Sequence, residues 1–111
     1  MHHDQQRAAA HLDDAINRGA FDEVKDLLDR GYDPNWRDIV GDTMLINAAW
    51  VGARKIVQVL IERGADVNGR GKDGQTALSR VLALDDPAEY GHDTVIALLQ
   101  AHGAQAYYIC G

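Results

Sequence analysis

The same short pattern, glycine-x-threonine-x-leucine, occurs twice in this chain, at an interval that many other identical residues share. The first copy runs from Gly41 to Leu45 and the second from Gly74 to Leu78. Further identical pairs have the same separation; they are Ala15 and Ala48, Val24 and Val57, Leu27 and Leu60, Gly31 and Gly64, and Asn35 and Asn68. A fixed period of about 33 residues is typical of solenoids, in which each unit buries its apolar face against its neighbours. The chain is therefore expected to be a scaffold with an extended binding surface.

The first unit is predicted to contain two helices. Apolar residues between Ala8 and Ile16 recur with helical spacing, and Asp4 is expected to be the N-cap. Asp13 and Asp14 fall outside the apolar stripe and are expected to face water. A second helix should follow and end at Gly31, because glycine adopts the left-handed conformation of a helix stop at little cost.

The later units repeat this arrangement with one irregularity. The spacing from Gly64 to Gly103 is longer than one period, and the excess indicates six inserted residues near 85–90. The last helix is expected to begin at His92, with Asp93 or Thr94 as its cap. The other predicted helices cover about 43–51, 53–63 and 76–84.

The segment from Asp38 to Asn68 resembles one ankyrin repeat from end to end. It departs from the family pattern at Met44, where the family prefers proline, and at Ile46-Asn47, where it prefers histidine-leucine. The resemblance covers residues 4–106 and implies an all-α solenoid of three helix-turn-helix units with projecting, hairpin-like loops. The expected repeats are 4–37, an atypical N-terminal cap, then 38–70 and 71–106, followed by an apolar tail at 107–111.

Composition limits the classes of partner. The chain has 111 residues, enough for one domain, and a net charge of −6 from 11 basic and 17 acidic residues. Nucleic acid is not expected as a partner, because neutralising phosphates requires a basic face. No apolar run is long enough to span a membrane and residues 1–7 lack the core of a signal peptide. With Cys110 as the only cysteine, these features favour a cytoplasmic location.

No set of residues predicts catalysis, a metal site or a cofactor. The string from Gly69 to Gly74 matches the dinucleotide-binding pattern G-x-G-x-x-G, but that motif requires a buried strand before it, and here a helix stop and a polar loop precede it. Ser79, the only serine, lacks the surroundings of a nucleophile. The histidines have no ligand spacing; they are His2, His3, His11, His92 and His102. We expect no enzyme activity.

The resemblance implies a concave recognition face made of the loop tips and the exposed side of each first helix. The predicted partner-binding residues are Ile39, Val40, Asp42, Trp50 and Val51 in the second repeat and Lys72, Asp73, Gln75 and Leu84 in the third, with Ala83, Asn17 and Arg18 in similar positions. Several are apolar where water is expected, namely Ile39, Val40, Trp50, Val51 and Leu84. Two interpretations of Trp50 stay open: the centre of an interface, or packing on Trp36 within the stack.

Two functions are compatible with these features. The first is an adaptor or regulatory module that binds an unidentified partner protein through the concave face. The second is an acidic inhibitor or immunity-type protein that blocks a basic active site, and it requires convergence of Asp38, Asp42, Asp73, Asp85, Asp86 and Glu89 on one edge. Self-association through the tail at 107–111 is compatible with either.

Overall fold

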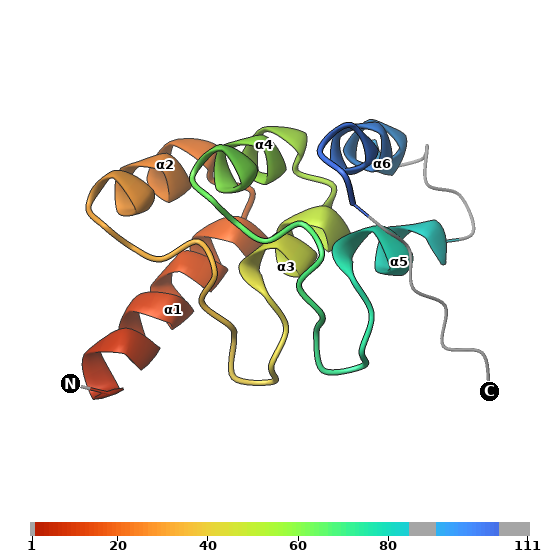
Figure 1. The fold of residues 1–111 in the computed structure, drawn as a ribbon. Helices are drawn as coiled ribbons and strands as arrows, with labels where there is room; N and C mark the ends of the chain where they lie inside the picture. Colours follow the sequence, from red (N-terminus) through yellow and green to blue (C-terminus); the bar gives the residue numbers. More distant parts are fainter. Residues whose placement is uncertain (1, 85–90, 105–111) are drawn as a thin grey trace.

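Six helices form two layers in the part of the chain that the computed structural model describes, residues 2–84 and 91–104. The helices are α1 (His2–Asn17), α2 (Phe21–Asp29), α3 (Met44–Val51), α4 (Arg54–Glu62), α5 (Ala77–Leu82) and α6 (His92–Ala101). Helices α1, α3 and α5 lie side by side in one layer, and α2, α4 and α6 lie side by side in the other (Figure 1). Two long loops project beyond the α1, α3 and α5 layer. The predicted all-α repeat fold is confirmed.

The repeated threonines begin the helices of the first layer. The Oγ1 of Thr43 accepts a hydrogen bond from the N–H of Ile46 at 3.1 Å, and the Oγ1 of Thr76 accepts one from Ser79 at 3.2 Å. Each bond satisfies a backbone donor that the first helical turn leaves without a partner. Both threonines are buried, so solvent does not compete for these bonds.

The core runs continuously through the stack, because α3 packs against α1, α4, α5 and α6. Leu45, Ile46 and Ala48 of α3 are buried, and the α2, α4 and α6 layer contributes further buried aliphatic residues. Those outer residues are Val24, Leu27, Leu28, Ile56, Val57, Val59, Leu60, Val95 and Leu99. The small side chain of Ala48 allows close approach of the helices, as a core almost without aromatic residues requires.

Some predicted helix ends are wrong. Helix α1 begins at His2, so Asp4 is inside the helix rather than at its cap. The N-cap of α6 is Gly91, with a φ of 80°, and Thr94 instead donates from its Oγ1 to the Gly91 carbonyl at 2.7 Å. Helix α5 ends at Leu82, two residues before the predicted limit. The expected insertion at 85–90 and the tail at 107–111 lie outside the described residues.

The first projecting loop is held by the side chain of Asp38. Its Oδ1 accepts hydrogen bonds from the N–H groups of Val40 at 3.0 Å and Asp42 at 2.9 Å. The backbone of Asp38 also donates to the Asp42 carbonyl at 2.9 Å, which closes a hairpin-like turn. This loop therefore contains its own carboxylate brace.

The second loop has no such brace of its own, because the position one repeat period after Asp38 is Gly71. The carboxylate of Asp42, from the preceding loop, lies beside Gly71 and accepts a hydrogen bond from the Lys72 N–H at 3.1 Å. A Cβ at Gly71 would overlap the Oδ1 of Asp42 and come within 2.9 Å of the Ile46 Cδ1. The missing side chain thus makes room for a brace supplied by the neighbouring repeat.

We predict that Gly71→Ala lowers the free energy of unfolding by about 1–3 kcal/mol, because the added methyl group displaces the Asp42 carboxylate from its hydrogen bonds. Gly69→Ala is the matched control, since a Cβ there meets its nearest neighbours at an ordinary 3.4 Å. Urea unfolding of both variants measures the difference. Equal stability of the two variants would show that the space beside Gly71 is not needed.

Candidate protein-binding grooves

A groove of about 510 Å³ lies between α3 and α5, beside the second loop. We call it the tryptophan groove; its lining residues are Asp42, Asn47, Trp50, Lys72, Asp73, Gln75, Arg80, Ala83 and Leu84. The structure therefore brings together six of the nine predicted partner-binding residues around one hollow. Trp50, Ala83 and Leu84 supply its apolar part, and the loop and Arg80 supply its polar part.

Trp50 is half exposed near the end of α3, with 53% of its surface accessible. Its backbone is fixed, because the buried His92 donates from Nε2 to the Trp50 carbonyl at 2.7 Å. Trp36 makes its ring contact with Tyr32, at a centroid distance of 5.5 Å, rather than with Trp50. The half-exposed side chain of Trp50 and the ring contact of Trp36 with Tyr32 favour the interface interpretation over packing of Trp50 on Trp36.

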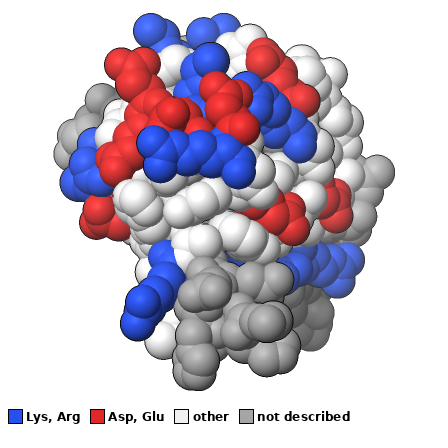
Figure 2. All heavy atoms as spheres, turned by 90° about the vertical axis from the view of Figure 1, so that its left-hand side faces the viewer, with Lys and Arg blue, Asp and Glu red and all other residues white. Residues whose placement is uncertain are grey.

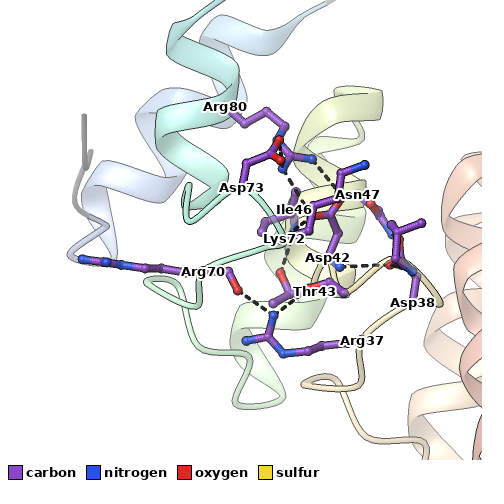
Figure 3. Close-up of polar contacts among 12 residues, drawn as sticks. Arg37, Asp38, Asp42, Thr43, Ile46, Asn47, Arg70, Lys72, Asp73 and Arg80 are labelled. Carbon is purple, nitrogen blue, oxygen red and sulfur yellow. Dashed lines mark hydrogen bonds and ion pairs between the residues drawn. The ribbon is translucent and has the colours of Figure 1, made fainter. Parts of the chain in front are cut away.

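Asp42 is the most connected polar residue at the tryptophan groove (Figure 3). Its carboxylate accepts hydrogen bonds from Arg80 Nη1 at 3.0 Å and Nη2 at 3.2 Å, in addition to the one from Lys72. Arg80 also lies 3.5 Å from the Asp73 carboxylate. Burial raises the pKa of Asp42, but the bonds from Arg80 and the Lys72 N–H outweigh burial and hold this pKa below its ordinary value.

Asp42 therefore does not have the solvent-exposed, partner-binding role that the sequence predicts for it. Only 5% of its surface is accessible, and its oxygens are occupied by groups of the same chain. A residue that was predicted to contact a partner instead joins the two loops to α5. Among the predicted site residues, Asp42 has a structural role.

A second groove, of about 600 Å³, lies between α1 and the first loop. We call it the acidic groove; its lining residues are Ala9, Ala10, Asp13, Asp14, Asn17, Arg37, Asp38 and Ile39. The Nδ2 group of Asn47 donates to both Asp13 Oδ1, at 2.7 Å, and Asp38 Oδ2, at 3.0 Å. One amide thus holds two carboxylates close together across the boundary between repeats.

Asp13 does not simply face water, as its position in the sequence predicts. It is partly buried, and this burial raises its pKa; the hydrogen bond from Asn47 opposes the rise, whereas the nearby charges of Asp38 and Asp14 add to it. The ionised form of Asp13 is therefore held in an environment that disfavours negative charge.

The apolar residues of the predicted site do not form one patch. Ile39 and Val40, at the tip of the first loop, are fully and half exposed, at 103% and 51%, which confirms their expected exposure. Ile39 lines the acidic groove, however, whereas Trp50 lines the tryptophan groove. Val51 and Leu84 are both partly buried, and Leu84 packs against the core while it also lines the tryptophan groove, so both are less exposed than Ile39 and Val40.

Asn47 and Arg80 line the candidate site, and sequence reasoning missed both. Asn47 stands where the ankyrin pattern has an apolar residue, so its departure from the pattern was the available signal. Arg80 gave no local signal, because its partners Asp42 and Asp73 come from different loops.

The glycine string from Gly69 to Gly74 lies in the loop between α4 and α5. Its backbone forms a turn in which the Gly71 N–H donates to the Gln75 carbonyl at 2.9 Å. A helix rather than a strand precedes it, so the prediction of an inter-repeat loop is confirmed. Among the residues described, no group of three histidine, cysteine or acidic side chains could hold a metal ion.

The excess of acidic residues does not make the surface at the α1 and α2 end uniformly negative. Figure 2 shows acidic and basic side chains alternating on this face. Arg18 pairs with Asp14 at 2.9 Å and with Glu23 at 2.5 Å, and Arg63 pairs with Asp29. The opposite charges within each pair cancel, and such exposed pairs contribute little to stability.

Comparison with known proteins shows which family the chain matches. A family model described as ankyrin repeats (3 copies) matches residues 12–108. A putative ankyrin repeat-containing protein of Treponema pallidum is 36% identical over 93% of this chain and 28% of its own length. Serine/threonine-protein kinase 12 of Arabidopsis thaliana is 35% identical over 80% of this chain and 18% of its own. The ankyrin repeat and SAM domain-containing protein 6 of Rattus norvegicus is 40% identical over 62% of this chain and 8% of its own length.

The chain thus spans less than a third of the length of each of these relatives. Its match to the kinase covers a minor part of that protein. No helix in the described part of the chain is both long and apolar enough to cross a membrane.

We predict that Asp42 stabilises the fold above its unfolded pKa and that this contribution is lost as pH falls through its lower folded pKa. Asp42→Asn should therefore cost about 1–3 kcal/mol at neutral pH and progressively less in acid. Urea unfolding across this pH range measures the difference.

Asp13→Asn is the control of opposite sign, because the folded pKa of Asp13 is raised. This variant should be at least as stable as the unsubstituted chain at neutral pH. A cost of Asp42→Asn that stays constant with pH would contradict the ionised role of Asp42.

Proposed function

We propose, because this chain belongs to the ankyrin-repeat family, that it acts as a non-enzymatic adaptor or regulator that binds a partner protein in its concave grooves. Ankyrin repeats generally mediate protein–protein interaction, and the proposal assigns that role to particular residues here. The observation that supports it best is the half-exposed Trp50 beside Ala83 and Leu84 in the tryptophan groove. Truncated aromatic residues in the centre of an interface account for some of the largest losses in affinity.

The proposed contact residues follow from their positions. Trp50, Lys72, Asp73 and Gln75 line the tryptophan groove, while Ile39 and Val40 are exposed at the loop tip. Val51 and Leu84 would support this surface from partly buried positions. Asp42 would fix the loop without touching the partner, because its side chain is buried and its carboxylate is paired with Arg80.

We further propose a cytoplasmic location, on the basis of the single cysteine. The acidic composition favours a protein partner rather than nucleic acid or membrane. Self-association through residues 107–111 stays a prediction, since these residues are outside the described part.

The alternative function, an inhibitor of a basic active site, receives less support from the geometry. It requires several free carboxylates on one edge, yet Asp42 and Asp73 both lie against Arg80. Asp38 lines the acidic groove, whereas Asp42 and Asp73 line the tryptophan groove, so these carboxylates do not share one edge. The remaining acids of that set, Asp85, Asp86 and Glu89, are not among the described residues.

We predict that Trp50→Ala weakens partner binding by about 2 kcal/mol or more, roughly 30-fold, while lowering the free energy of unfolding by less than about 2 kcal/mol. The limited loss of stability follows from the exposure of Trp50, because truncating a fully buried tryptophan costs about 3–5 kcal/mol. Affinity capture from cells, followed by titration of the purified partner, measures binding, and denaturant unfolding measures stability.

Leu82→Ala is the matched control, since Leu82 is an exposed apolar residue of α5 that lies outside the groove lining. Binding by the Trp50 variant that equals that of the Leu82 control would remove the tryptophan groove from the proposed site. A large loss of stability in the Trp50 variant would indicate a packing role instead.

A further inference from the structure

The acidic groove combines a negative wall with an apolar one. Asp13, Asp14 and Asp38 contribute three carboxylates, of which Asp14 is paired with Arg18, and Arg37 contributes the only basic side chain of the lining. Ala9, Ala10 and the fully exposed Ile39 provide the apolar surface. A ligand that fits both walls carries a positive charge at the end of an aliphatic chain.

In the described ranges, 2–84 and 91–104, the Arg37 guanidinium forms no ion pair with the carboxylates of the groove. Its Nη1 donates to the carbonyls of Gly41 at 2.7 Å and Arg70 at 2.5 Å, so its guanidinium is held by the two loops (Figure 3). Asp13 and Asp38 form no ion pair within the described part of the chain, and their shared hydrogen-bond donor is the neutral amide of Asn47. Among the described residues, these two neighbouring carboxylates are thus not directly paired with a cation.

A cation entering the groove would favour the ionised form of Asp13. Burial and the charges of Asp38 and Asp14 already raise the pKa of Asp13, because they disfavour its ionised form. The absence of any three-ligand cluster among the described residues argues against a metal ion as this cation.

We propose that the acidic groove receives an arginine side chain of the partner protein, with the guanidinium at Asp13 and Asp38 and an adjacent apolar residue of the partner on Ile39. Arginine fits better than lysine, because its planar fork can donate to two carboxylates at once and its stem can lie along Ala9 and Ala10. This inference rests on the proposed function and specifies the chemistry of the partner. The exposed apolar Ile39 beside the carboxylates distinguishes a protein segment from a small free cation.

The test is a nuclear magnetic resonance titration of the ¹⁵N-labelled chain with a capped hexapeptide in which leucine and arginine alternate. The side-chain amide of Asn47 reports directly, because it touches both carboxylates. We expect saturable shifts of this amide and of the Ile39 backbone N–H. The same peptide with citrulline, which has a similar shape without the charge, should bind at least about tenfold more weakly.

Asp13→Asn should weaken binding of the arginine peptide by at least about tenfold, and its fold is expected to persist because burial already disfavours the charge of Asp13. Asp22→Asn removes the same charge from the exposed surface of α2 and should leave binding unchanged. The citrulline comparison uses the unsubstituted chain, so it stays decisive even if a variant does not fold.

Equal binding of the arginine and citrulline peptides, or no saturable binding, would overturn the arginine proposal. Shifts centred on the indole N–H of Trp50 would overturn it as well, while supporting the concave surface as a binding site. Shifts confined to α2, α4 and α6 would contradict both this inference and the proposed function.

Discussion

The carboxylate of Asp42 joins three parts of the structure that are far apart in sequence. It receives hydrogen bonds from the backbone of Lys72 in the second loop and from the guanidinium of Arg80 in α5, while its own backbone is held by Asp38. A buried carboxylate is stable only when its oxygens are satisfied, so this arrangement allows few alternatives. The position of the second loop relative to α3 and α5 depends on it.

The positions of the two grooves depend on the loops that Asp42 and Asp38 hold in place. With the loops fixed, Lys72, Asp73 and Gln75 border the tryptophan groove on one side of the Asp42 cluster. On the other side, Asn47 connects α3 to Asp13 and Asp38 at the acidic groove. The grooves differ in chemistry, because Arg80 pairs with both Asp42 and Asp73 in the first, whereas Asp13 and Asp38 in the second have no ion pair among the described residues. A partner that occupies both would present an apolar residue to Trp50 and a cation to Asp13.

The repeat period was sufficient to predict the helix pairs and the buried aliphatic positions, because these depend on local sequence and on contacts that recur in each repeat. It was not sufficient for Asp42, which reads locally as a solvent-exposed loop residue. Its burial depends on the absence of a side chain at Gly71 and on Arg80, which comes from the following repeat. Similarly, the sequence predicts that Asp13 faces water, whereas in the structure Asp13 is partly buried and accepts a hydrogen bond from Asn47. Polar contacts between repeats depend on pairs of departures from the repeat pattern, which periodicity does not predict.

A double-mutant cycle between Asp42 and Arg80 tests most directly whether the Asp42 carboxylate joins the loop to α5. The free energies of unfolding of Asp42→Asn, Arg80→Gln and the double variant, relative to the unsubstituted chain, isolate the interaction between the two side chains. If the Asp42 carboxylate joins the loop to α5 as described, the coupling free energy should be at least about 1 kcal/mol at neutral pH. Additive effects, with a coupling near zero, would contradict the account.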